Sequence, residues 1–163
     1  MNKARVLLIT PNLKGIKDGL NRIQPSLGLM TIAQSLLNNN HIVKIHDTAL
    51  EGWHNKQDID NNKIMIGQSD EEIEKVIREF NPDIVGISIL FSNLNQSAHT
   101  IAKIIKKINK KIWVFIGGNH ISNSLIDYQH NIVHPGDDIP LIKDLEDKNI
   151  DLAMVGEGDF TVV

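Results

Sequence analysis

Short apolar runs alternate along the chain with stretches in which apolar residues recur at helical spacing. Apolar runs of this length predict buried strands, and apolar positions three and four residues apart predict amphipathic helices. We expect five strands, at residues 5–10, 42–47, 83–88, 112–116 and 150–155. We expect helices at residues 25–38, from a capping box at Ser69 to just before Pro82, and at residues 95–109.

Strands that alternate with helices are typical of stacked β-α-β units, which build a parallel sheet. Five such strands predict a doubly wound α/β fold with the flavodoxin-like strand order 2-1-3-4-5 and helices on both faces. Residues 48–68 are polar and without clear period, so we expect a long excursion with apolar anchors at Trp53 and residues 64–66. Residues 122–149 are mixed, with a turn at Pro135-Gly136 and a short helical piece at residues 141–145.

The composition of the chain excludes several classes of protein and of functional site. The chain has 163 residues, no cysteine and a formal net charge of -3. The absence of cysteine excludes a disulfide scaffold, a thiolate zinc site, an iron–sulfur cluster and a cysteine nucleophile within this chain. The negative charge argues against a nucleic-acid partner. The apolar run at residues 6–9 is far shorter than the ~20 residues of a membrane span and shorter than a signal-peptide core. We therefore expect one cytoplasmic domain.

Small residues follow three successive predicted strands. Ser88-Ile89-Leu90 comes at the end of the third strand. Gly117-Gly118 follows the fourth strand, and Gly156-Glu157-Gly158 follows the fifth. In an open parallel sheet ligands bind outside these carboxyl ends. Glycine lets a ligand approach the backbone, and a serine hydroxyl can bind a polar group. The pattern predicts a deep slot for a large, flat or elongated ligand; the alternative is that these residues only form turns and caps.

Several common strand-end sites are excluded. The glycine-rich dinucleotide turn is missing after the first strand, and a Walker loop and a Gly-x-Ser-x-Gly nucleophile elbow occur nowhere. We identify neither a catalytic residue nor a set of metal ligands. His120 follows the glycine pair, and from there it could approach a ligand or serve a structural role.

The motifs as a set resemble a known family. They are Pro25-Ser-Leu-Gly-Leu29, Asn40-His-Ile-Val43, Asp47, Ile66-Gly-Gln-Ser69, Pro82-Asp-Ile-Val-Gly-Ile-Ser88, Gly117-Gly-Asn-His120 and Val155-Gly-Glu-Gly158. In this order, over essentially the whole chain, they are similar to the cobalamin (vitamin B12)-binding domain that precedes the catalytic barrel in B12-dependent radical SAM enzymes. That group includes methyltransferases and proteins similar to the anaerobic magnesium-protoporphyrin monomethyl ester cyclase.

The resemblance implies roles for particular residues. Ser88 and Leu90 match an element whose serine faces the dimethylbenzimidazole tail of cobalamin. Gly117 and Gly118 match the paired glycines beside which the tail passes. Gly156, Glu157 and Gly158 match the motif after the fifth strand. Asn12, Ser92 and His120 complete our candidate cofactor-binding residues.

One departure from the wider cobalamin-domain pattern concerns the cobalt. The loop at residues 11–24 contains no histidine, whereas other branches of cobalamin domains supply a histidine to the metal there. The resemblance to the radical SAM branch implies cobalamin bound base-off without a histidine ligand. Asn12 and Leu13 are candidates for the lower face of the metal.

The resemblance also implies that cobalamin binding and catalysis belong to different domains. Residues 1–163 would be the N-terminal cobalamin-binding module of a longer protein. A C-terminal radical SAM barrel outside this chain would hold a 4Fe-4S cluster and S-adenosylmethionine, so this fragment would not be catalytic alone. Two alternatives stay open at this point. One is an independent flavodoxin-like nucleotide-binding, flavin-binding or regulatory domain, and the other is a scaffold that a partner domain completes.

Overall fold

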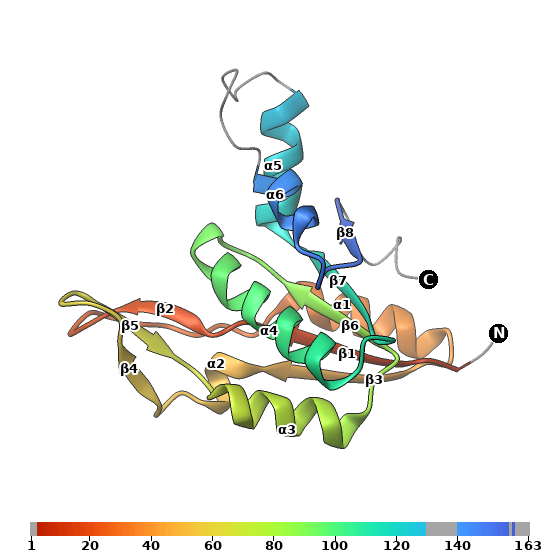
Figure 1. The fold of residues 1–163 in the computed structure, drawn as a ribbon, viewed down its shortest axis with the longest axis horizontal. Coiled ribbons are helices and arrows are strands. Elements are labelled where there is room, and N and C mark those ends of the chain that lie inside the picture. The colour runs from red at the N-terminus through yellow and green to blue at the C-terminus, as the bar shows by residue number, and fades with distance from the viewer. Residues whose placement is uncertain (1–2, 130–139, 157, 159–163) are drawn as a thin grey trace.

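The computed structural model describes residues 3–129, 140–156 and 158 (Figure 1). Its centre is a five-stranded parallel sheet with the order β3-β1-β6-β7-β8. The strands are β1 (Arg5–Thr10), β3 (Ile42–Asp47), β6 (Ile84–Ser88), β7 (Trp113–Gly117) and β8 (Leu152–Met154). Counted along the chain, this is the order second, first, third, fourth, fifth, as the sequence predicts.

Helices cover the two faces of this sheet unequally. On one face, α3 (Asp70–Phe80), α4 (Asn95–Ile108) and α5 (Asn119–Gln129) contribute to the larger apolar core, together with Leu7 and Ile9 of β1. On the other face, α1 (Leu27–Asn38) packs against Val6 and Leu8. Neighbouring residues of a strand point to opposite faces, which is why the continuous apolar run of β1 serves both cores. Within the described ranges, no helix is both long and apolar enough to cross a membrane.

The α1 face of the sheet is only partly covered. α1 lies over β1, and the described residues place no helix over the β7 and β8 part of this face. Trp113 of β7 and Leu152 of β8 are therefore 55% and 48% exposed. Parallel sheets normally have both faces buried. This region is thus the least covered apolar surface of the sheet.

The ends of α3 follow from local chemistry. The Ser69 hydroxyl accepts a hydrogen bond from the Glu72 amide, and the Glu72 carboxylate accepts one from the Ser69 amide at 2.8 Å. This reciprocal pair is the expected capping box. At the other end, Asn81 adopts a left-handed conformation with φ 46°, and Pro82 then prevents the helix from continuing.

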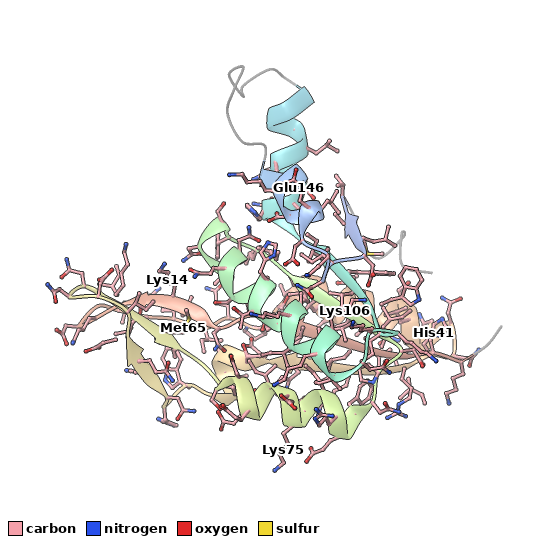
Figure 2. The ribbon with its side chains drawn as sticks, in the orientation of Figure 1. Lys14, His41, Met65, Lys75, Lys106 and Glu146 are labelled. Carbon is pink, nitrogen blue, oxygen red and sulfur yellow. The ribbon has the colours of Figure 1, made fainter. Side chains whose placement is uncertain are left out.

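Residues 48–68 form the expected excursion, anchored by buried Ile64 and Ile66, but it is more regular than the sequence indicates. This segment contains α2 (Thr48–Glu51), β4 (Lys56–Asp58) and β5 (Lys63–Ile66), and β5 pairs antiparallel with β4 and with β2 (Leu13–Ile16). The resulting sheet, β2-β5-β4, projects from the domain, and Figure 2 labels Lys14 and Met65, which are register partners in it. These strands have three or four residues each, so each depends on its neighbours in the sheet. β4 pairs with the nearby β5, whereas β5 pairs also with the distant β2.

The region from residue 122 to 149 is also more regular than expected. α5 spans Asn119–Gln129, and its asparagine and serine residues mask the helical period in the sequence. Its attachment rests on Ile121, which is fully buried against the sheet. α6 (Pro140–Glu146) contains the expected helical piece at residues 141–145. The expected turn at Pro135-Gly136 lies outside the described residues.

Polar contacts attach α6 to α4. His99 of α4 contacts Asp147 at 2.6 Å and Asp144 at 2.9 Å, and Asn95 donates to Asp144 at 2.7 Å. Burial lowers the pKa of His99, but hydrogen bonds to Asp147 and Asp144 outweigh this effect, so the pKa of His99 is raised. Burial raises the pKa of Asp147, but the bonds from His99 and Asn149 outweigh it, so that pKa is lowered. Protonated His99 therefore stabilises this end of the domain.

Replacing His99 should make the domain less stable, and more so in weak acid than in alkali. Because the pKa of His99 is raised, its contribution is present below the unfolded value of about 6.5 and is lost as pH rises through the folded value. We expect His99→Gln to lower the free energy of unfolding by about 1.5 kcal/mol at pH 6 and by less at pH 9. Urea unfolding at both pH values measures this, with exposed His54→Gln as the control; an equal loss at both pH values would contradict the assignment.

Candidate functional site

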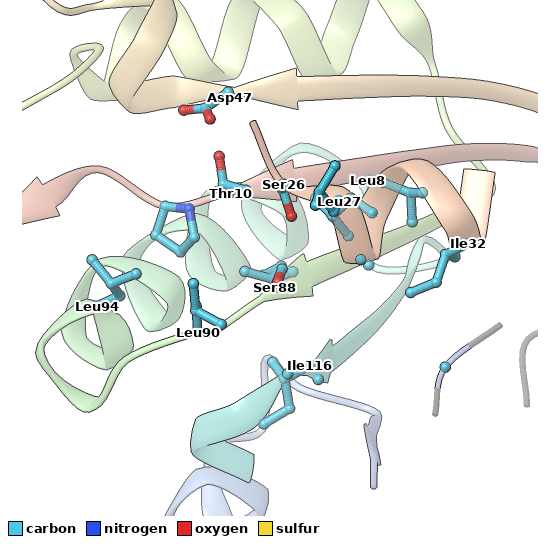
Figure 3. A pocket seen from close by; sticks show the side chains of 18 of the residues that line it. Leu8, Thr10, Ser26, Leu27, Ile32, Asp47, Ser88, Leu90, Leu94 and Ile116 are labelled. Carbon is cyan, nitrogen blue, oxygen red and sulfur yellow. The ribbon is translucent and has the colours of Figure 1, made fainter. Parts of the chain in front are cut away.

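A cavity of about 790 Å³ lies at the carboxyl ends of the parallel strands, on the α1 side of the sheet (Figure 3). Its floor is the α1-facing set of strand residues, which includes Val6, Leu8 and Gly86. Leu29 and Ile32 of α1 form one wall. The size is within the usual range for sites that bind small molecules and cofactors. The mostly apolar lining suits a flat or elongated organic group.

The loops that follow β6 and β7 form a second wall and are bonded to each other. The Ile89 amide donates to the Gly117 carbonyl at 2.7 Å, and the His120 amide donates to the Ile89 carbonyl at 3.1 Å. Gly118 lies between these bonds with φ 109°, and a Cβ there would be 2.8 Å from the Ile89 carbonyl oxygen. Only glycine fits this position without strain. At Gly117 a Cβ would meet nothing closer than Met154, at 3.5 Å.

The segment after β8 closes the cavity toward α1. Gly156 has φ 85°, and its amide donates to the Ser122 hydroxyl at 3.1 Å. A Cβ at Gly158 would lie 2.9 Å from Cδ1 of Ile32 in α1, so this glycine permits a close approach of the chain to the helix. Glu157 lies outside the described residues.

Six of the residues singled out in the sequence line this one cavity. They are Ser88, Leu90, Gly117, Gly118, Gly156 and Gly158. Their convergence follows from the parallel register, which places Ser88 beside Gly117 and Gly117 beside Met154. Their role in ligand binding remains a prediction.

Asn12 has a different environment. Its side-chain amide donates to the Gln68 carbonyl at 2.8 Å, and its side chain is packed against Gly67, where a Cβ would overlap the Asn12 oxygen. Asn12 is not among the cavity-lining residues, whereas its neighbour Leu13 is. The observed contacts of Asn12 thus join the loop after β1 to the segment before α3.

Ser92 and His120 lie behind the cavity wall rather than in the cavity. The Ser92 hydroxyl and Nδ1 of His120 are 3.0 Å apart, and Ser92 begins the short 3-10 helix η1 (Ser92–Leu94). His120 is 8% exposed, and its Nε2 lies 3.5 Å from the Asp144 carboxylate of α6. These contacts connect the wall to α6.

The cavity also has polar residues that the candidate set omits. Thr10 ends β1 and Asp47 ends β3, and the two are partners in the parallel register. Both line the cavity, as do Arg22 and Ser26 in the segment that leads into α1. The position of Asp47 at a strand end was a usable signal in the sequence. Nothing in the sequence signals that residues 22–26 approach the cavity, because their position depends on the path of a loop.

The described residues hold no group of three or more histidines and carboxylates arranged to bind a metal ion. The residues that line the cavity include no histidine in the described part of the chain. The cavity by itself therefore offers apolar surface, backbone and a few hydroxyl and charged groups.

A comparison with protein-family models identifies the domain: residues 14–140 match the model of the B12 binding domain. The chain belongs to the B12-binding domain family. The match covers β3, β6 and β7 of the parallel sheet and the helices from α1 to α5, and it includes most of the residues that line the cavity. Membership supports cobalamin as the ligand.

Two curated relatives are methyltransferases. This B12-binding domain is 33% identical over 159 residues to a cytidylyl-2-hydroxyethylphosphonate methyltransferase of Streptomyces wedmorensis, covering 96% of this chain and 27% of the relative. It is 33% identical over 117 residues to an uncharacterized methyltransferase of Pyrococcus horikoshii, covering 72% of this chain and 22% of the relative. The chain thus spans about a quarter of the length of these relatives.

The geometry of this B12-binding domain fits the cofactor in two respects. The missing side chain at Gly117 leaves room in the cavity, since a Cβ there would have only ordinary contacts. The Thr10 hydroxyl is closed to water and has no hydrogen-bond partner among the described residues, so a polar group beside the cavity can bond to a ligand once its χ1 angle rotates. An elongated organic group with polar substituents meets both conditions.

The two glycines of the β7 loop should respond differently to an added methyl group. We expect Gly118→Ala to lower the free energy of unfolding of this B12-binding domain by about 2 kcal/mol, because φ is positive and the new Cβ meets the Ile89 carbonyl. Gly117→Ala should change it by less than about 0.5 kcal/mol, since Met154 is at ordinary contact distance. Urea unfolding of the two variants provides the measurement. Equal losses would show that the backbone contact at Ile89 is not what requires Gly118.

Proposed function

We propose that this domain binds cobalamin base-off, with its nucleotide tail in the strand-end cavity, as the cofactor module of a B12-dependent radical SAM methyltransferase or cyclase. The observation that carries the proposal is the mostly apolar cavity into which Ser88, Gly117 and Gly118 converge. Their arrangement leaves backbone, rather than side chains, along one wall. A flat heteroaromatic tail can pack closely against such a wall.

Each lining residue has a distinct task in this proposal. Ser88 presents a small hydroxyl to the buried end of the tail. Gly117 leaves open the space that the tail occupies, and Leu90 packs beside it. When bound, cobalamin would supply a cobalt centre able to carry a methyl group; the protein supplies position and excludes water.

The cavity composition supports binding without a histidine on cobalt. The loop at residues 11–24 has no histidine, and the described cavity lining has none either. Leu13 lines the cavity at the start of that loop. We therefore place an apolar side chain, rather than an imidazole, on the side of the cofactor that faces the domain.

We further propose that the complete protein carries a radical SAM barrel that holds a 4Fe-4S cluster and S-adenosylmethionine. The relatives support a longer protein with a methyltransferase activity, since both are named methyltransferases and this chain spans 27% and 22% of them. The barrel, the cluster and S-adenosylmethionine rest on the resemblance of the sequence motifs to the radical SAM branch. The partly covered β7 and β8 surface, with Trp113 and Leu152 half exposed, offers apolar area on which further protein can pack. Catalysis would then belong to the assembled protein.

Retention of hydroxocobalamin tests the cofactor proposal. We expect the purified domain, incubated with hydroxocobalamin and desalted, to retain cobalamin with a base-off absorption spectrum. Ser88→Leu and Gly117→Val should each weaken binding at least about tenfold, because the larger side chains fill the cavity. Thr100→Leu, an exposed change on α4, is the matched control and should bind normally.

Two results would contradict the proposal. One is a folded wild-type domain that retains no cobalamin but retains a flavin or a nucleotide, which would favour an independent flavodoxin-like binding domain. The other is normal binding by both cavity-filling variants, which would show that the tail lies elsewhere. Circular dichroism of each variant separates loss of binding from loss of folding.

A further inference from the structure

Thr10 and Asp47 form a polar corner in the otherwise mostly apolar cavity. They end the adjacent parallel strands β1 and β3 and are register partners, so their side chains share one face of the sheet. Both line the cavity. Figure 3 shows the Thr10 hydroxyl on the side of its residue that faces the Asp47 carboxylate.

Asp47 has one carboxylate oxygen engaged in the fold and one that is not. Its Oδ1 accepts a hydrogen bond from the Leu50 amide at 2.9 Å and so caps α2. Its Oδ2 has no hydrogen bond or ion pair with any residue of the described ranges. The first bond fixes the side chain at the cavity edge. The second oxygen remains able to accept a hydrogen bond from a ligand.

The hydroxyl of Thr10 is the second polar group of the corner. Its Oγ1 is closed to water and has no partner in the described part of the chain, and a buried hydroxyl without a partner is unfavourable. Because Thr10 lines the cavity, rotation about its χ1 angle would turn the hydroxyl toward a ligand. The fold itself thus leaves a hydrogen bond at this corner to be made.

The charge of the corner restricts what it can bind. A carboxylate oxygen accepts hydrogen bonds and repels anions, so a phosphate is disfavoured here. The matching ligand group is a neutral hydroxyl or amide N–H. Carboxylates at the end of the second strand of other open parallel sheets bind ribose hydroxyls in this way.

We propose that Thr10 and Asp47 form a subsite that binds hydrogen-bond donor groups of the ligand and so sets which corrinoids this domain prefers. The inference rests on the proposed cobalamin function. Cobalamin has two sources of such donors, which are the hydroxyls of the ribose in its nucleotide tail and the amide groups on its corrin ring. Binding of cobinamide, which keeps the ring amides but lacks the nucleotide tail, distinguishes them.

The experiment compares the affinities of Asp47→Asn and Thr10→Val for hydroxocobalamin and for cobinamide. The asparagine side chain keeps an oxygen that can cap α2 but replaces the acceptor Oδ2 with a donor. We expect about a tenfold loss of affinity for Asp47→Asn and about a fivefold loss for Thr10→Val. Asp60→Asn is the matched control for the first, because Asp60 Oδ1 accepts from the Lys63 amide at 2.8 Å in the same local pattern but outside the cavity. Thr100→Val is the control for the second.

Each outcome decides the inference. A loss for cobalamin with cobinamide binding unchanged supports the subsite and assigns it to the nucleotide tail; a loss for both supports it and assigns it to the ring amides. A change below about twofold for both variants, or an equal loss in the controls, overturns it. A folded wild-type domain that binds neither corrinoid would instead refute the proposed function, so the two failures are distinguishable.

Discussion

Two hydrogen bonds between the loops after β6 and β7 determine the shape of the cavity. The Ile89 amide bonds to the Gly117 carbonyl at 2.7 Å and the His120 amide to the Ile89 carbonyl at 3.1 Å, so neither loop can move without the other. The close approach requires the positive φ of Gly118. It also fixes Leu90 and Gly117 on the same wall. The small residues at these strand ends are therefore needed to form the wall, and they are also candidates for binding the ligand.

The wall is supported from behind by a cluster of polar groups, of which His120 and Asp144 are buried. His120 follows the second of these bonds, and its ring lies between Ser92 and Asp144. Asp144 is in turn held by His99 and Asn95 of α4. Buried polar groups stabilise a fold when their partners are present and destabilise it when one is lost. This cluster therefore couples the position of the wall to the attachment of α6, and the raised pKa of His99 belongs to its α4 end.

The sequence predicted those parts of the domain that depend on local pattern. β1 and α4 carry apolar residues at strand and helix spacing, and the glycine pair at 117–118 marks a strand end, so the main sheet and six cavity residues were recognisable. The β2-β5-β4 sheet was not recognisable, because its strands have only three or four residues and β2 pairs with β5 across about fifty residues of sequence. The placement of Asn12, Ser92 and His120 was not predictable either, since it depends on which neighbours complete their hydrogen bonds.

The unequal covering of the sheet explains why the cavity lies on the α1 side. α3, α4 and α5 bury one face, whereas α1 alone buries the other among the described elements. The free energy gained from burying apolar area grows with the area removed from water, so a ligand gains most on the less covered face. The same face carries Gly86 and Gly117, whose missing side chains deepen the cavity. A bound cofactor would thus complete a core that the fold leaves open, and its binding would stabilise the domain by mass action.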